Sequence, residues 1–207
     1  MPALLDAAQP LLATAFTWWG SPVTWLEIVA FALGIGMVIC NLKVNPMGWP
    51  LAIASSLLYA LLFAHAQLHG QALLQGFFVA ISAWGWWQWT RGAQHTRRVR
   101  WMSLRGQAVA AAATLLAWPL TAAWLMQVQP APTAWPDAFT TVASVTGQVL
   151  LGLKRVETWP VWVVVNVAGM ALFASQGLWL TVLLYGVFTA LSVAGWRAWL
   201  RLAQAAQ

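Results

Sequence analysis

The chain has 207 residues, of which 61% are hydrophobic and only 7% are charged, and its formal net charge is +6. About a quarter of the residues of a soluble domain are charged, so this composition excludes a soluble globular protein and indicates an integral membrane protein. The single cysteine, Cys40, permits neither an internal disulfide nor a cysteine-based metal site. The basic residues are scattered at the ends of apolar segments, which is typical of membrane orientation and argues against a nucleic-acid partner.

Seven apolar segments have about the length, roughly 20 helical residues, that is needed to cross ~30 Å of hydrocarbon. They cover residues 22–41, 47–66, 71–90, 106–127, 136–153, 159–176 and 178–199. Residues 1–21 lack a basic start and a convincing cleavage site, so we expect an interfacial helix or a ragged extra span there and not a signal peptide. The predicted fold is an all-α integral membrane protein of seven transmembrane helices, with room for an extra N-terminal interfacial helix.

With seven spans, every basic residue falls on the same side of the membrane. The breaks after the first, third, fifth and seventh spans hold all ten of them: Lys43, Arg91, Arg97, Arg98, Arg100, Arg105, Lys154, Arg155, Arg197 and Arg201. The positive-inside rule makes this side cytoplasmic. We therefore expect the first core span to begin outside and the C-terminus to be cytoplasmic.

An internal repeat relates the two halves of the chain. Residues 49–89 align with residues 159–199 at a fixed offset of 110 without gaps, and 15 of the 41 pairs are identical. The identities that are not merely aliphatic include Trp49/Trp159, Pro50/Pro160, Phe63/Phe173, Gly76/Gly186, Phe78/Phe188, Gly85/Gly195, Trp86/Trp196 and Trp89/Trp199. Two units of three helices can share an orientation only if an odd number of spans joins them. We therefore predict a 3+1+3 plan of parallel repeats, between which transporters commonly bind substrate.

This plan divides the chain into five parts. They are an N-terminal interfacial segment (1–21), the first three-helix repeat (22–90), a basic cytoplasmic loop with the connecting helix (91–127), the second repeat (128–199) and a cytoplasmic tail (200–207).

The stretch TWPVWVVVN, residues 158–166, sets two tryptophans and an asparagine into a run of valines. Trp159, Trp162 and Asn166 stand at i, i+3 and i+7, so on a helix they lie within roughly 60° of one another. One interpretation is a membrane-edge tryptophan, a packing tryptophan and an interhelical hydrogen bond. The other is a polar and aromatic strip that faces a ligand.

The long stretches NPMGWPLAIASSLLYALLFAHAQLHGQALLQGFFVAISAWGWWQW, PDAFTTVASVTGQVLLGLKRVETWPVWVVVN and GLWLTVLLYGVFTALSVAGWRAW resemble the PnuC family of vitamin transporters, whose fold is related to the SWEET sugar carriers. The resemblance covers nearly all of residues 27–199. It implies that Trp159, Trp162 and Asn166 contribute to a site for nicotinamide riboside, the vitamin B3 precursor of NAD. It also implies a multi-pass protein of the bacterial inner membrane that works by facilitated diffusion and alternating access, with a cytosolic kinase trapping the substrate.

The chemistry of this strip suits the implied substrate. Nicotinamide riboside carries a cationic pyridinium, and a tryptophan face attracts a flat cation by about 0.5–2 kcal/mol per contact. An asparagine side chain both donates and accepts, which suits a carboxamide or a ribose hydroxyl. Thiamine, another cationic ring, fits equally well, and riboflavin would use the stacking alone. Some family members carry these two vitamins, so both stay open as alternatives.

Six further residues are candidates for the substrate site: Gln75, Tyr185, Trp49, Ser56, Trp86 and Gln148. Gln75 and Tyr185 are equivalent in the two repeats, and Ser56 is the equivalent of Asn166. Interhelical hydrogen bonding is the alternative role for the first pair, and an aromatic belt is the alternative for Trp86. Glu27, a carboxylate inside the first span, is a functional candidate by default, and we expect a gating or structural role.

The sequence contains no phosphate-binding loop, no Ser-His-Asp pattern and no HExxH motif, so we expect neither an enzyme nor a cofactor or metal. Two other functions remain open, a sugar carrier of the SWEET type and a membrane subunit that binds a substrate without moving it. The expected partners are the lipid bilayer and a small-molecule vitamin, and a homo-oligomer is compatible with the pattern.

Overall fold

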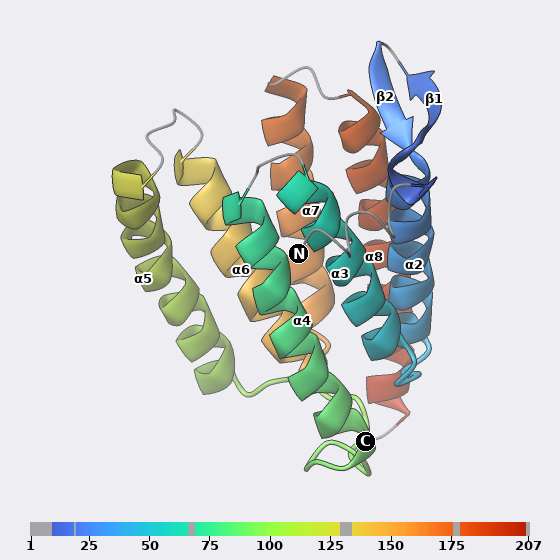
Figure 1. The fold of residues 1–207 in the computed structure, drawn as a ribbon. Coiled ribbons are helices and arrows are strands. Elements are labelled where there is room, and N and C mark those ends of the chain that lie inside the picture. Colours follow the sequence, from blue (N-terminus) through green and yellow to red (C-terminus); the bar gives the residue numbers. More distant parts are fainter. Residues whose placement is uncertain (1–9, 19, 66–68, 129–133, 176–178, 206–207) are drawn as a thin grey trace. The chain divides into compact units, whose positions relative to one another are not determined.

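Figure 1 shows the computed structural model, which describes residues 10–18, 20–65, 69–128, 134–175 and 179–205. Two strands and seven helices follow in order: β1 (Thr14–Trp18), β2 (Ser21–Thr24), α2 (Trp25–Leu42), α3 (Gly48–His65), α4 (His69–Thr90), α5 (Leu104–Val128), α6 (Ala134–Gly152), α7 (Thr158–Ser175) and α8 (Trp179–Gln204). Each predicted apolar segment corresponds to one of these helices. The described part of the chain is thus mostly helical, and the chain forms two compact units, residues 1–87 and 88–207.

Within the described residues, three stretches are long and apolar enough to cross a membrane by length and composition, namely Trp25–Leu42, Leu104–Gln127 and Val182–Gln204. Gly48–Leu62 and Thr158–Leu172 are shorter apolar helices.

The N-terminal segment differs from the predicted interfacial helix. Residues 10–12 are helical, but Thr14–Trp18 and Ser21–Thr24 pair as an antiparallel hairpin. Threonine and aromatic residues favour extended backbone, and Gly20 supplies the positive φ of 81° in the connection. The prediction of a helix was therefore wrong for the hairpin residues, while residues 1–9 lie outside the described part of the chain.

In the first unit, α2 begins with a capping box. The Thr24 hydroxyl accepts the Glu27 N–H at 3.2 Å, and the Glu27 carboxylate accepts the Thr24 N–H at 2.8 Å. Helix α2 then packs against α3, and the buried Ser55 hydroxyl donates to the Ala30 carbonyl at 2.8 Å. This bond ties the two helices together inside the apolar region.

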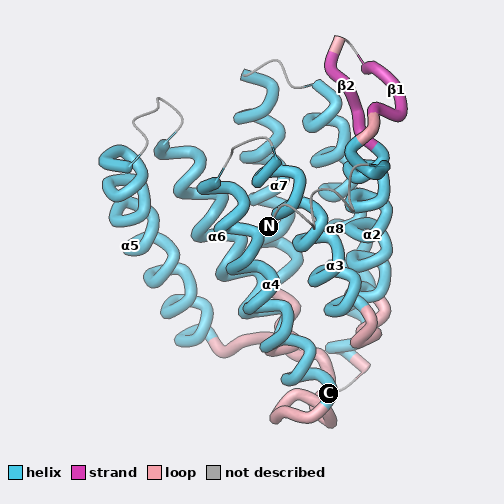
Figure 2. The backbone as a smooth tube through the Cα atoms, in the orientation of Figure 1, coloured by secondary structure: helices cyan, strands magenta, loops and turns pink. Residues whose placement is uncertain are grey.

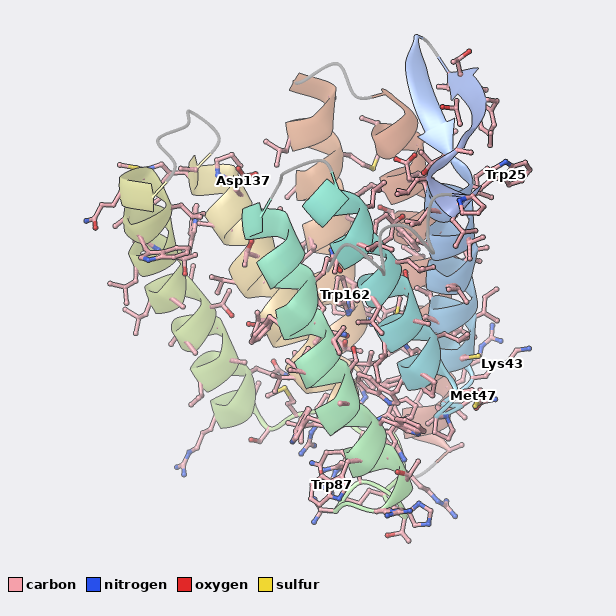
Figure 3. The ribbon with its side chains drawn as sticks, in the orientation of Figure 1. Trp25, Lys43, Met47, Trp87, Asp137 and Trp162 are labelled. Atoms are coloured by element: carbon pink, nitrogen blue, oxygen red, sulfur yellow. The ribbon has the colours of Figure 1, made fainter. Side chains whose placement is uncertain are left out.

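The turn from α2 to α3 is reproduced in the turn from α6 to α7. Val44 and Lys154, which are 110 positions apart, both take left-handed backbone, with φ of 54° and 52°. Six backbone hydrogen bonds of the first turn recur in the second at the same offset; for example, Asn45 N–H donates to Cys40 O at 2.8 Å and Arg155 N–H to Leu150 O at 2.9 Å. Such a left-handed residue after a helix satisfies its last carbonyls. Lys43 and Met47, labelled in Figure 3, mark the first of these turns.

In the second unit, α6 packs between α5 and α7, and α7 packs against α8. The Thr114 and Thr146 hydroxyls join α5 to α6 at 2.7 Å. Most of α5 is exposed apolar surface, which suits a helix that faces lipid.

The basic loop between α4 and α5 is docked on the α6–α7 turn (Figure 2, pink). Arg100 pairs with Arg155 in a parallel β-bridge, through Arg100 N–H to Lys154 O at 3.2 Å and Val156 N–H to Arg100 O at 3.3 Å. Lys154 is only 6% exposed. Its ammonium donates to Gln94 O at 2.7 Å and Arg97 O at 3.3 Å, and lies 5.1 Å from the centre of a Trp89 ring.

Lys154 is therefore a buried residue that binds the loop to the turn, as well as one of the ten basic residues on which the predicted orientation rests. Burial lowers the pKa of its ammonium, whereas the two carbonyls and the indole face favour the charged form.

Candidate functional site

Helix α7 carries the three residues of the predicted strip and is fixed at its start. The buried Thr158 hydroxyl donates to Gly147 O of α6 at 2.8 Å. Because α7 runs without a break from Thr158 to Ser175, Trp159, Trp162 and Asn166 occupy one helix as predicted.

Trp159 is the most enclosed of the three, with 2% of its surface exposed. Its ring lies directly over Gly195 of α8, where an added Cβ would come within 2.5 Å of three ring atoms. The Trp199 ring stands edge-on to it at 5.5 Å. Its Nε1 is buried and has no hydrogen-bond partner in the described part of the chain. Trp159 thus packs against α8, and its indole N–H is a buried donor without a partner among the described residues.

Trp162 is half-buried and turns toward α6 (labelled in Figure 3). Its Nε1 and Cε2 lie 3.1 Å from the position that a Cβ of Gly147 would take. Gly147 has no side chain, and this allows the close approach. Another part of the Trp162 side chain stays exposed.

Asn166 is 5% exposed and is held by α8. Its Nδ2 donates to the Ser192 hydroxyl at 3.3 Å. This bond is the interhelical contact that the first interpretation of the strip required. It uses one donor of the amide, and an asparagine amide has further capacity to donate and accept.

Two more predicted candidates lie in the second unit. Gln148 is 6% exposed and follows Gly147 on α6. The Tyr185 ring of α8 lies over Gly169 of α7, where an added Cβ would come within 2.5 Å of Cε1. Helix α7 therefore contacts α6 where Trp162 meets Gly147, and α8 through Ser192 and Tyr185. The candidates of the second unit lie on three helices that pack in sequence, α6, α7 and α8.

The remaining candidates lie in the first unit. Trp49 is 1% exposed and covers Gly85 as Trp159 covers Gly195. Ser56 and Gln75 are half-buried, whereas Trp86 is 44% exposed, as a residue of an aromatic belt would be.

The carboxylate of Glu27 accepts the N–H of Thr24 at 2.8 Å and its hydroxyl at 3.2 Å. Of the two roles predicted for Glu27, gating and structural, this geometry supports the structural one.

Sequence reasoning missed the residues that seat the strip: Gly147, Ser192, Gly195 and Trp199. Three of them carried a signal, because Ser192, Gly195 and Trp199 are identical to Ser82, Gly85 and Trp89 in the repeat. Nothing in the sequence pointed to Gly147.

The apolar helices, together with two indoles and an amide on one face of α7, fit a membrane protein that binds a small aromatic molecule. The family model for the nicotinamide mononucleotide transporter matches residues 24–201, and the chain belongs to this family. This membership confirms the resemblance to PnuC and establishes that the chain is a transporter and not an enzyme.

Relatives and a solved structure support the same conclusion. The chain is 26% identical to the nicotinamide riboside transporter PnuC of Escherichia coli (strain K12) over 213 residues, and the alignment covers 89% of each chain. It is 27% identical to the riboflavin/roseoflavin transporter RibM of Streptomyces davaonensis over 199 residues, and that alignment covers 91% of each chain. The crystal structure of the vitamin B3 transporter PnuC is similar to it with a TM-score of 0.72 at 25% identity, over 87% of this chain and 82% of that one.

Proposed function

We propose that the chain takes up nicotinamide riboside across the bacterial inner membrane by facilitated diffusion. The observation that carries this proposal is the strip on α7, in which the partly exposed indole of Trp162 and the buried amide of Asn166, held by Ser192, lie on one apolar helix. The family membership and the relative from Escherichia coli support the same substrate. A cytosolic kinase that phosphorylates the vitamin would make the uptake effectively one-way.

The three residues of the strip differ in burial, and we assign each a different role in binding the substrate. Trp162, which is partly exposed, offers its face to the pyridinium, an attraction of about 0.5–2 kcal/mol. Asn166, oriented by Ser192, hydrogen-bonds the carboxamide or a ribose hydroxyl. Trp159 is enclosed between Gly195 and Trp199, so it acts as the wall behind the site. Gln148 and Tyr185 complete the site from the neighbouring helices.

The proposal includes the 3+1+3 plan, with the first core span beginning outside. The duplicated turn hydrogen bonds and the repeated seating of a tryptophan on a glycine support two equivalent three-helix repeats. Rocking of one repeat against the other would expose the substrate to each side in turn. In the first repeat, Trp49, Ser56, Gln75 and Trp86 are the equivalents of Trp159, Asn166, Tyr185 and Trp196, and they stay candidates for substrate binding.

Riboflavin is the second candidate, because the relative named for it is as similar as the one named for nicotinamide riboside. Both ligands would stack on an indole, but only the pyridinium adds a cation–π attraction. Thiamine, the second choice on the sequence alone, comes third here, because its cationic ring would also stack on an indole but no relative named above carries it.

Equilibrium binding to the purified protein tests the proposal. Nicotinamide riboside, thiamine, riboflavin and an uncharged sugar are titrated in parallel against the parent, Trp162→Ala and Asn166→Ala. Val164→Ala serves as the matched control, because Val164 lies on the same helix and is 52% exposed. We expect tight binding of nicotinamide riboside that weakens about tenfold or more in both site variants, in line with a lost buried hydrogen bond or cation contact. Binding of another ligand replaces the substrate, and equal binding by all variants refutes the site.

Flux into liposomes that contain the protein tests the transport step. We expect entry down the substrate gradient without ATP or an ion gradient. Binding without flux would identify a non-transporting subunit instead.

A further inference from the structure

Three arginines of the second unit lie on the α6–α7 turn and on the loop that is docked on it. Arg97 and Arg100 belong to the docked loop, and Arg155 belongs to the α6–α7 turn. We call Arg97, Arg100 and Arg155 the arginine patch. Arg100 and Arg155 are bridge partners, so their side chains leave neighbouring strands that lie about 4.8 Å apart. Both guanidiniums of the loop lower the pKa of Arg155, together with burial, which is the larger cause.

The patch is held together by buried groups. Lys154 binds the carbonyls of Gln94 and Arg97, and the Arg155 guanidinium donates to Trp101 O at 3.2 Å. Glu157 accepts the Met102 N–H at 2.9 Å and the Gln107 amide at 2.9 Å. The loop that carries two of the arginines is thus fastened at several points to the turn that carries the third.

The mutual repulsion of the patch is offset only in part. Glu157 is the one carboxylate among the causes that act on the pKa of Arg155, and it raises that pKa while Arg100 and Arg97 lower it. Its Oε1 is already engaged by two donors. The patch therefore keeps an excess of positive charge. The orientation rule needs basic residues on one side of the membrane, but it does not need residues 55 positions apart to be fixed against each other.

Apolar side chains adjoin the patch. Trp101 is 41% exposed and Leu104, the first residue of α5, is 83% exposed. Further along α5, Leu115 and Leu116 are 60% and 70% exposed. A ligand that satisfies both the arginines and this surface has an anionic head and apolar tails.

We propose that the arginine patch is a binding site for the phosphate headgroup of an anionic phospholipid, whose acyl chains lie along α5. Guanidinium forks bind phosphate oxygens in pairs, and the exposed start of α5 receives the chains. The bound lipid neutralises the patch and fastens the docked loop to the membrane surface. Basic pockets on the cytoplasmic side of membrane proteins recognise such headgroups.

The test compares two double variants of the full-length protein. Arg97→Gln/Arg100→Gln removes two exposed charges of the patch, and Arg197→Gln/Arg201→Gln removes two exposed charges from α8 as the matched control. Each protein in neutral detergent is titrated with phosphatidylglycerol or phosphatidylcholine, and native mass spectrometry counts the lipids that remain bound. We expect phosphatidylglycerol to bind the parent and the control alike, and the patch variant about tenfold or more weakly.

Three results would overturn the proposal. Equal loss in the control would show a general charge effect. Equal binding of the two lipids would show that the headgroup is not recognised. Displacement of phosphatidylglycerol by an equal concentration of glycerol phosphate would assign the patch to a soluble phosphate compound. The melting temperature of the patch variant without lipid shows that it is folded, and Arg97→Lys/Arg100→Lys should keep part of the affinity because the charge is retained.

Discussion

Replacing Gly195 by alanine tests whether Trp159 is seated as the structure places it. The added methyl would come within 2.5 Å of Cε3, Cη2 and Cζ3 of the indole. Ordinary carbon contacts lie at about 3.5–4.0 Å, so the ring must retreat by roughly 1–1.5 Å. The neighbouring Trp199 ring, 5.5 Å away and edge-on, restricts that retreat.

The magnitude follows from two opposing terms. Overpacking a buried site costs about 1–3 kcal/mol, whereas alanine gains up to about 1 kcal/mol over glycine in a helix. Gly186→Ala separates the two terms, because Gly186 lies on the same helix and its added Cβ meets only the flexible end of Met170 at 3.9 Å. The difference in unfolding free energy between the two variants is therefore the overpacking cost alone.

Thermal unfolding followed by tryptophan fluorescence measures this difference. For a chain of this size, about 1–3 kcal/mol corresponds to a Tm difference of roughly 2–12 °C, with Gly195→Ala the lower. Nicotinamide riboside binding should weaken in Gly195→Ala and stay unchanged in Gly186→Ala, since only the first displaces the wall of the site. If both variants melt and bind alike, Trp159 does not rest on Gly195 and the proposed site loses its wall.

Three other predictions concern contacts away from the strip. Glu27→Ala should lower stability by about 0.5–2 kcal/mol through loss of the Thr24 capping box and leave the transport rate unchanged, whereas a gating carboxylate would alter that rate in liposome flux assays. Thr114→Val should cost about 0.6–2 kcal/mol, and in a double-mutant cycle with Thr146→Val additive losses would contradict a direct bond. Lys154→Val should keep the turn but release the docked loop, and lower the free energy of unfolding by about 1.5–3 kcal/mol. Limited proteolysis should then cleave the loop, and a loop that stays intact would show that Lys154 does not hold it.

The apolar character and the length of the segments were enough to predict the helices. Each apolar segment became a helix because its residues could not satisfy their backbone in lipid otherwise, and the α7 strip followed from spacing alone. The hairpin at Thr14–Thr24 was missed because its apolar run is short, and short runs do not distinguish strand from helix.

The partners of the strip could not be predicted from spacing. Which residue of α8 meets Trp159 depends on the rotation and the relative height of two packed helices, and neither appears in the periodicity of either helix. The repeat nevertheless contained the answer in part. Trp49 and Gly85 recur as Trp159 and Gly195, and both pairs are in contact. A tryptophan and a glycine that recur together at one offset therefore indicate a contact between their two helices.

The two duplicated turns share one backbone conformation, but their side chains make different contacts. Val44 demonstrates that the left-handed position after the helix accepts a side chain without any polar partner, so the fold of the turn does not require a lysine at position 154. The second turn nevertheless carries Lys154, and this residue binds the loop that precedes α5. Glu157 fastens the same loop, where the first repeat has Met47. The turn itself does not need these polar contacts. What they do is fix the position of the basic loop.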